Sequence, residues 1–297
     1  MFKLYNDLIS MITIDKFKLS YEYYSTKINK INLKFIQNYM YLFKFIVDIE
    51  NINDIFRLAA DIGFINLIKI LIKDKRVYPN NNRNYAIKLA SEHGHLEIVK
   101  LLLKNKHVNP SVEENYALGM AAENGYYKVV KLLLKDKRVN PSDNGNYAIE
   151  LASENGHYKV VKLLLKDKRV DPGDNNNFSL QQTISYGHLK IVKLLLKDKR
   201  VDPSNIINSA IIYASEYGHY KIVKLLLKDK RVDPSDRNNY AIQLASENGH
   251  YKVVKLLLKD KRVDPNDNNN YAIRYATENG HIEIVKLLSK DKRIDIN

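Results

Sequence analysis

The feature that most constrains this chain is a sequence repeat with a period of 31 residues. The runs NYAIELASENGHYKVVKLLLKDKRVDP, from Asn146, and NYAIQLASENGHYKVVKLLLKDKRVDP, from Asn239, are almost identical and lie three periods apart. A unit of this length cannot bury its own apolar face, so a fixed period of this size predicts a solenoid of stacked units. Eight units are predicted, at 54–84, 85–115, 116–146, 147–177, 178–208, 209–239, 240–270 and 271–297.

Fixed rows of glycine, proline and asparagine predict the local structure of each unit. In the unit from Tyr147, we expect Asn146 to cap a first helix and Gly156 to end it in a left-handed turn. A second helix is expected from about His157 to Lys166, and Pro172 opens a polar loop that cannot continue it. The glycine row is Gly63, Gly94, Gly125, Gly156, Gly187, Gly218, Gly249 and Gly280.

The order of helix, glycine turn, helix and polar loop resembles the ankyrin repeat. The run LASENGHYKVVKLLL, from Leu151, carries the resemblance: paired small residues, a glycine, and a valine before three leucines. The family's Thr-Pro-Leu-His opening is Tyr-Ala-Ile-Glu here, at Tyr147, and a unit is two residues shorter than the usual 33. The resemblance implies an all-α solenoid of stacked helix-turn-helix units, with loops too short for a full β-hairpin. The loop run KDKRVDP also resembles the ankyrin repeat proteins of giant amoeba viruses.

Residues 1–53 do not follow the period well. We interpret them as a non-repeat segment that forms a degenerate capping unit, because a solenoid needs an atypical end. The alternative is an adaptor such as a divergent F-box, although no leucine-proline motif of that kind is present. Asp7 and Asp15 interrupt the apolar start, so we expect no signal peptide. No run of 18 apolar residues occurs, so we expect no transmembrane segment.

Composition and motifs argue against an enzyme. The chain has no cysteine, which excludes disulfides, thiolate zinc sites and a cysteine nucleophile. No phosphate loop, nucleophile elbow or His-Glu-x-x-His motif occurs, so we predict no catalytic residue and no cofactor. A histidine row is expected to bond backbone rather than metal, because stacked helices separate its members too widely for shared ligation. Its members are His95, His157, His188, His219, His250 and His281.

Lysines recur at helical spacing along one face of the second helices. The formal net charge is +14, and this face would supply much of it. One interpretation is a solvated surface favoured by the helix dipoles, and the functional alternative is a binding face for nucleic acid or an acidic membrane. The lysines that define the predicted face are Lys128, Lys131, Lys135, Lys159, Lys162, Lys166, Lys252, Lys255 and Lys259.

The function we predict is a non-catalytic scaffold that binds a protein on the concave side of the solenoid. Positions not fixed by packing should drift, and in two central units they become apolar or aromatic, as an interface core requires. The alternative is neutral drift. The predicted partner-binding residues are Tyr186, Ile206, Ile207, Ile212 and Tyr217. We expect a cytoplasmic monomer, in a host cell if the chain is viral, with an unknown and possibly host-encoded protein partner.

Overall fold

The computed structural model describes residues 52–294, in which every regular element is an α-helix and no strand occurs. This confirms the predicted all-α class. The chain divides into two compact units, residues 1–117 and 118–297, which are described separately. The predicted cap at 1–53 lies outside the described residues except for its last two positions, so it stays a prediction.

The described part of the first unit, residues 52–117, contains two helix pairs and the start of a further helix. Helix α4 (Ile52–Asp61) precedes α5 (Ile65–Leu71), and α6 (Asn81–Glu92) precedes α7 (Leu96–Leu103). The next helix, α8, runs over Val112–Glu123 and crosses the boundary between the units. Helices α4 and α6 pack side by side, and their pairs enclose a core in which Phe56 and Ile87 are fully buried.

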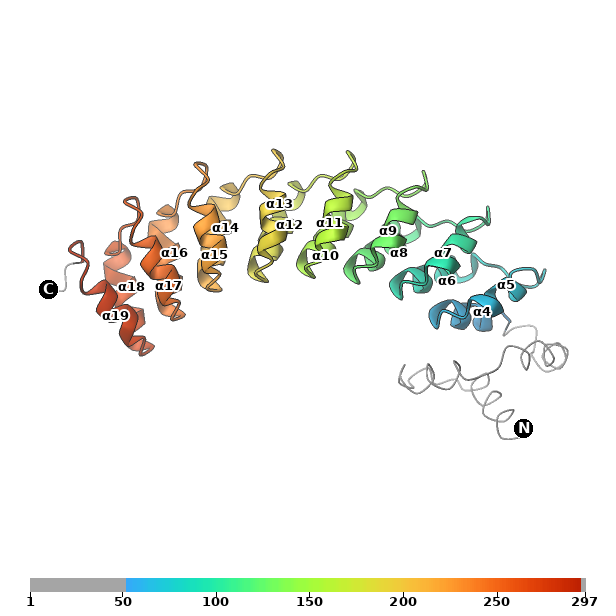
Figure 1. Cartoon of the computed structure of the whole chain (residues 1–297), viewed down its shortest axis with the longest axis horizontal. Helices are drawn as coiled ribbons and strands as arrows, with labels where there is room; N and C mark the ends of the chain where they lie inside the picture. Colours follow the sequence, from blue (N-terminus) through green and yellow to red (C-terminus); the bar gives the residue numbers. More distant parts are fainter. Residues whose placement is uncertain (1–51, 295–297) are drawn as a thin grey trace, which may run out of the picture. The chain divides into compact units, whose positions relative to one another are not determined.

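The second unit arranges its helices in two layers (Figure 1). First helices form one layer, and shorter second helices form the other, in front of it in the view of Figure 1. The first helices are α10 (Asp143–Glu154), α12 (Asp174–Ser185), α14 (Asn205–Glu216), α16 (Asp236–Glu247) and α18 (Asp267–Glu278). The second helices are α9 (Tyr127–Leu133), α11 (Tyr158–Leu164), α13 (Leu189–Leu195), α15 (Tyr220–Leu226), α17 (Tyr251–Leu257) and α19 (Ile282–Leu288).

The core lies between the two layers. In the pair α10 and α11, Ile149 on the first helix and Val161 and Leu164 on the second are fully buried. The sequence places Leu163 and Leu165 in the same apolar run as Leu164, but both are only half-buried. The second helix therefore buries a narrower face than the sequence predicts, and its remaining surface is available for other contacts.

The predicted left-handed glycines are confirmed, because all eight members of the glycine row have positive φ. Gly156 follows α10 with φ 75° and also faces the ring of His188 from the following pair. A Cβ at Gly156 would lie 2.7 Å from Cε1 of that ring. Nε2 of His188 is 2.8 Å from the carbonyl oxygen of Glu154, and because a carbonyl can only accept, Nε2 carries the proton. Gly156 is thus needed both for its conformation and for the space that the histidine ring occupies.

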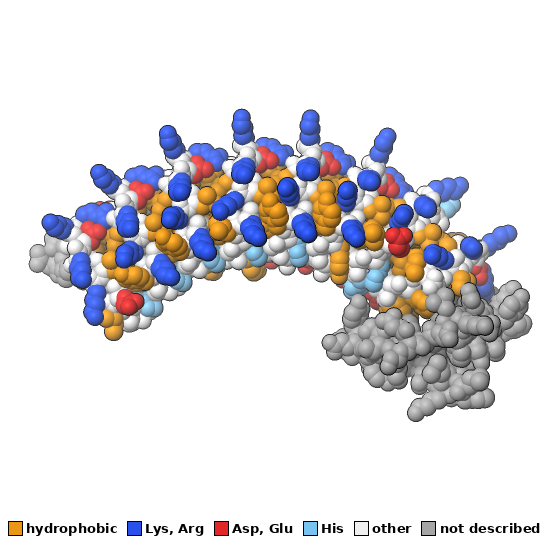
Figure 2. Space-filling view, viewed as in Figure 1, with side chains coloured by type: hydrophobic (Ala, Val, Ile, Leu, Met, Phe, Trp, Pro, Cys, Tyr) orange, Lys and Arg blue, Asp and Glu red, His pale blue; other side chains and the backbone are white. Residues whose placement is uncertain are grey.

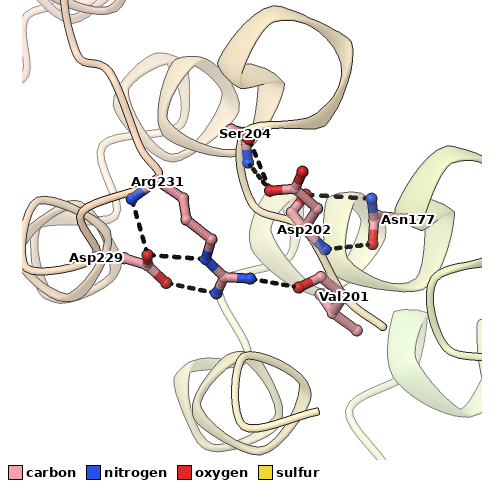
Figure 3. A network of polar contacts seen from close by, with 6 residues as sticks. All are labelled: Asn177, Val201, Asp202, Ser204, Asp229 and Arg231. Carbon is pink, nitrogen blue, oxygen red and sulfur yellow. Dashed lines mark hydrogen bonds and ion pairs between the residues drawn. The ribbon is translucent and has the colours of Figure 1, made fainter. Parts of the chain in front are cut away.

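The asparagine row does not cap the helices, which corrects our expectation. These residues end a left-handed turn of three residues at the start of each first helix from α6 onward, as Asn177 does with φ 61°. The Asn177 side chain is buried and reaches the next loop, where it accepts a hydrogen bond from the Asp202 N–H at 3.1 Å. It also donates to the Asp202 carbonyl at 3.2 Å (Figure 3). The amide therefore joins successive units, because a left-handed backbone directs it away from its own helix.

A second bridge explains the Lys-Asp-Lys-Arg loops. Arg231 forms an ion pair with Asp229 at 2.7 Å and donates through Nη1 to the Val201 carbonyl of the preceding loop at 2.9 Å (Figure 3). The hydrogen bond from Arg231 lowers the pKa of Asp229 below its ordinary value, so the carboxylate stays ionised at neutral pH. The arginine of the Lys-Asp-Lys-Arg loop thus supplies a bond between successive units. The same bridge is made by Arg169, Arg200, Arg262 and Arg293.

Replacing Asn177 with alanine should lower the free energy of unfolding by about 2 kcal/mol, because both polar backbone groups of Asp202 would lose their partner. Urea denaturation followed by circular dichroism measures the change. Asn176→Ala is the matched control, since Asn176 has the same left-handed backbone but an exposed side chain. Equal losses in the two variants would mean that backbone preference, and not the bridge, accounts for the asparagine row.

Candidate functional site

Two tyrosines project from the ends of neighbouring first helices. Tyr186 follows α12 and is 58% exposed, and Tyr217 follows α14 and is 49% exposed. The Tyr186 ring stacks against His188 with centroids 6.2 Å apart, and its hydroxyl donates to Glu154 at 3.3 Å. The charge of Glu154 and this hydrogen bond raise the pKa of Tyr186. Tyr217 lies against His219 in a similar way, with centroids 6.3 Å apart. The pair therefore presents two oriented aromatic rings to solvent.

Two isoleucines occupy the left-handed turn at the start of α14. Ile206 has φ 48° and Ile207 has φ 54°, and they are 40% and 49% exposed. A left-handed conformation costs roughly 1–2 kcal/mol per residue with a Cβ, and branching at Cβ makes it still less favourable. The equivalent residues before α18 are Asn268 and Asn269, which tolerate this conformation. The fold requires a left-handed turn here in every such unit, but only the turn of α14 fills it with isoleucines, which are both strained and apolar, where other units have Asn, Arg, Glu or Gly.

Ile212 does not belong to an exposed site, which corrects our expectation. Its side chain is 5% exposed, and the same position in other first helices holds the buried residues Glu150 and Gln243. The first helices α12, α14 and α16 pack directly side by side, so this flank of each helix is covered by a neighbour. Burial raises the pKa of the Glu150 carboxyl. The residue type at this position therefore varies with the packing between neighbouring first helices, and not with contact to a partner.

The four exposed residues do not form a single contact cluster. Ile206 and Ile207 lie at the start of α14, and Tyr217 lies directly after its end. At a rise of 1.5 Å per residue, the ten positions from Ile207 to Tyr217 separate the two groups by about 15 Å. Tyr186 and Tyr217 are close enough for the charge of one to affect the other. The arrangement is thus an aromatic pair at one end of the first helices and an apolar turn at the other.

The predicted lysine face is exposed at every position. Figure 2 views the layer of second helices, and lysine and arginine side chains recur over it at regular intervals. The nine lysines of the prediction are all exposed, and the ring of Tyr251 lies 5.7 Å from Nζ of Lys255. In contrast, Arg169, which follows Lys166 in the loop, is held in a bridge. The structure thus separates free cations on the helices from structural cations in the loops.

The histidine row bonds backbone throughout, as predicted. Each of the six histidines places Nε2 within 2.7–2.9 Å of a backbone carbonyl 34 residues earlier. Burial lowers the pKa of His95, although its bond to the Asp61 carbonyl acts in the opposite direction. In the described range, 52–294, no three metal-ligating side chains form a group that could hold an ion. None of the helices there qualifies as a membrane-spanning segment.

Our sequence interpretation missed the loop aspartates and arginines, whose bonds stabilise the contacts between units. The signal was present: an aspartate stands two residues before every loop arginine, and both recur in seven of the eight units, the exception being Asn105 and His107. This spacing allows the carboxylate to bind the guanidinium in a bidentate manner, which is the strongest common ion-pair geometry.

Pairs of helices joined by glycine turns and bonded in series define a helical solenoid of short repeats. A family model described as ankyrin repeats (3 copies) matches residues 55–143, 105–176, 149–238 and 211–297. These matches span most of the sequence, and the chain belongs to the ankyrin repeat family. Repeats of this family typically mediate protein–protein interaction and are non-enzymatic. No curated protein matches the chain.

Proposed function

We propose that this chain is a non-catalytic adaptor that recognises a protein partner through the layer of first helices, centred on α12 and α14. This is the side that the sequence predicts to be concave. The proposed contact residues are Tyr186, Ile206, Ile207 and Tyr217, all of which are exposed. Ile212 is left out because it is buried.

The observation that carries this proposal is the strained turn at Ile206 and Ile207. Exposed apolar side chains gain nothing from water, and a left-handed backbone adds a conformational cost for each isoleucine. Strain of this kind persists where it serves a function, such as a binding site. A partner that buried both side chains would offset the cost, so the turn has the properties of an interface anchor.

The geometry also supports a description of the partner surface. It would span about 15 Å along α14, with an apolar patch facing the isoleucines and a surface suited to aromatic rings facing the tyrosines. The His188 contact and the Glu154 hydrogen bond hold Tyr186 in place before binding. Less side-chain entropy is then lost when a complex forms.

A photo-crosslinking amino acid at position 207 should capture a defined protein from the host cell. The same group at position 238, the equivalent place in the turn before α16, should capture little of it. Ile206→Asn together with Ile207→Asn should abolish capture through a crosslinker placed at position 186. The matched control Arg237→Asn, at the position equivalent to Ile206, should leave capture unchanged. Full capture by the folded isoleucine double variant would contradict the proposed site.

The proposed location, oligomeric state and partner of the chain depend on this proposed function. We place the chain in the cytoplasm of the cell in which its partner occurs, as a monomer. The resemblance of its loops to viral ankyrin proteins supports a host protein as that partner. Purification of the tagged chain from fractionated cells would test the location and the partner together.

A further inference from the structure

Five consecutive second helices carry an identical set of lysines, which we name the lysine rows. The helices are α9, α11, α13, α15 and α17, and none of them contains an acidic residue. Three lysines belong to each helix or directly follow it, and all are exposed. The rows comprise Lys128, Lys131, Lys135, Lys159, Lys162, Lys166, Lys190, Lys193, Lys197, Lys221, Lys224, Lys228, Lys252, Lys255 and Lys259.

Nothing within the described chain accounts for the rows. The ion pairs of residues 118–294 all use the loop arginines, and none uses a lysine of the rows. Lys162 and Lys166 are spaced i, i+4, an arrangement in which like charges repel across a helix surface. The rows therefore gain no ion pair to offset this repulsion, and within the helix only the dipole favours the lysine of the last turn.

The rows are nevertheless invariant, whereas other exposed positions of the same unit vary. The exposed position at Asn144 becomes Ile206 and Arg237 in later units, and the exposed Asn155 becomes Tyr186. Recent duplication alone would keep both kinds of position identical. The exposed loop arginines also stay constant, but their ion pairs account for that. The lysines of the rows have no such ion pair, so their constancy points to a requirement outside the chain, and a regular array of cations fits a polyanion.

The lysine rows match the backbone of a nucleic acid duplex better than they match a membrane surface or a single strand. Stacked helices lie about 8–10 Å apart, so five of them present cations over roughly 40 Å, and a duplex carries one charge per about 1.7 Å of its axis. None of the exposed large apolar side chains of residues 52–294 lies on these five helices. A membrane surface would therefore find no apolar anchor, and single-stranded bases would find no exposed ring to stack upon.

We propose that the lysine rows bind double-stranded nucleic acid through its phosphates, without reading its sequence. Lysines act here as point charges, which position a backbone but do not distinguish bases. This surface lies on the layer of second helices, and the proposed protein site lies on the layer of first helices. The chain could then hold a protein and a duplex at the same time, and either interaction stands without the other.

The test measures binding of the full chain to a 20-base-pair duplex as a function of salt concentration. Each phosphate neutralised contributes about −0.9 to the slope of log affinity against log salt. Lys159→Gln, Lys162→Gln and Lys166→Gln together should weaken binding roughly tenfold or more at low salt and make the slope shallower by about 3. Two duplexes of unrelated sequence should behave alike.

A control variant with the same change in net charge keeps the test sharp. Asn144→Asp, Asn238→Asp and Asn268→Asp together also lower the net charge by three, by adding three negative charges on exposed turns at the start of the first helices. It should leave affinity and slope unchanged, and circular dichroism checks that both variants are folded. The proposal is overturned by no duplex binding at low salt or by equal losses in the two variants. It is also overturned by tighter binding to single strands or to phosphatidylserine vesicles than to the duplex.

Discussion

Gly156→Ala is expected to lower the free energy of unfolding by about 3 kcal/mol, which is the largest loss we expect from a single methyl group in this chain. A Cβ in the left-handed conformation costs roughly 1–2 kcal/mol. The same Cβ would lie 2.7 Å from Cε1 of His188, so the ring must move and release the Glu154 carbonyl. A buried acceptor without its donor adds about 1–3 kcal/mol. Urea denaturation of the purified variant measures the sum.

The chain contains its own control for this prediction. Gly280 has φ 73°, close to the 75° of Gly156, but no atom lies within 4 Å of the Cβ it would gain. Gly280→Ala should therefore lose only the conformational part, about 1 kcal/mol. His188→Ala combined with Gly156→Ala should recover part of the loss of the glycine variant, because the clash is gone. Equal losses at Gly156 and Gly280 would show that the histidine ring does not constrain the turn.

Ile206→Asn together with Ile207→Asn should raise the free energy of unfolding by about 2 kcal/mol. Both residues are held with positive φ, a conformation that asparagine adopts at much lower cost. The change also removes two exposed apolar side chains without touching the core. Thermal and urea denaturation of the double variant measure the gain, which should appear whether or not a partner is present.

The reverse exchange provides the matched measurement. Asn268→Ile together with Asn269→Ile places the same isoleucines in the equivalent turn before α18, and it should destabilise by a similar amount. If the Ile206→Asn, Ile207→Asn double variant is more stable but no longer captures the partner, the isoleucines lower the stability of the chain and are needed for binding. No gain in stability would mean that the turn before α14 is not strained, and the main argument for the proposed site would fail.

Most of the fold could be predicted because each unit is short and the same residue types recur at equivalent positions of successive units. Gly156 can adopt the left-handed turn that other residues avoid, and Pro172 fixes its own φ, so local rules were sufficient to place both helices of the unit. Repetition then tested each local interpretation several times in one chain. Ile149 and Val161 are buried as their helical spacing predicts.

The parts that could not be predicted depend on contacts between units. Asn146 precedes a helix, and a local rule makes it a cap, but its amide bonds Asp171 of the next loop at 2.7 Å. Ile212 varies as a surface residue would, but the neighbouring first helices cover it. A position that varies from unit to unit can therefore be exposed, or it can be buried among neighbours that vary as well, and the sequence alone does not distinguish the two cases.

The bridges between units have a consequence for how a gene for such a chain can change. The asparagine bond always spans 25 residues, the arginine bond 30 and the histidine bond 34, each joining one unit to the next. An in-frame duplication or deletion of 31 codons preserves all three offsets, wherever in the unit the break falls. Unequal recombination can thus lengthen or shorten the array by one unit in a single step. Each product can form all three bonds between its units without further mutation.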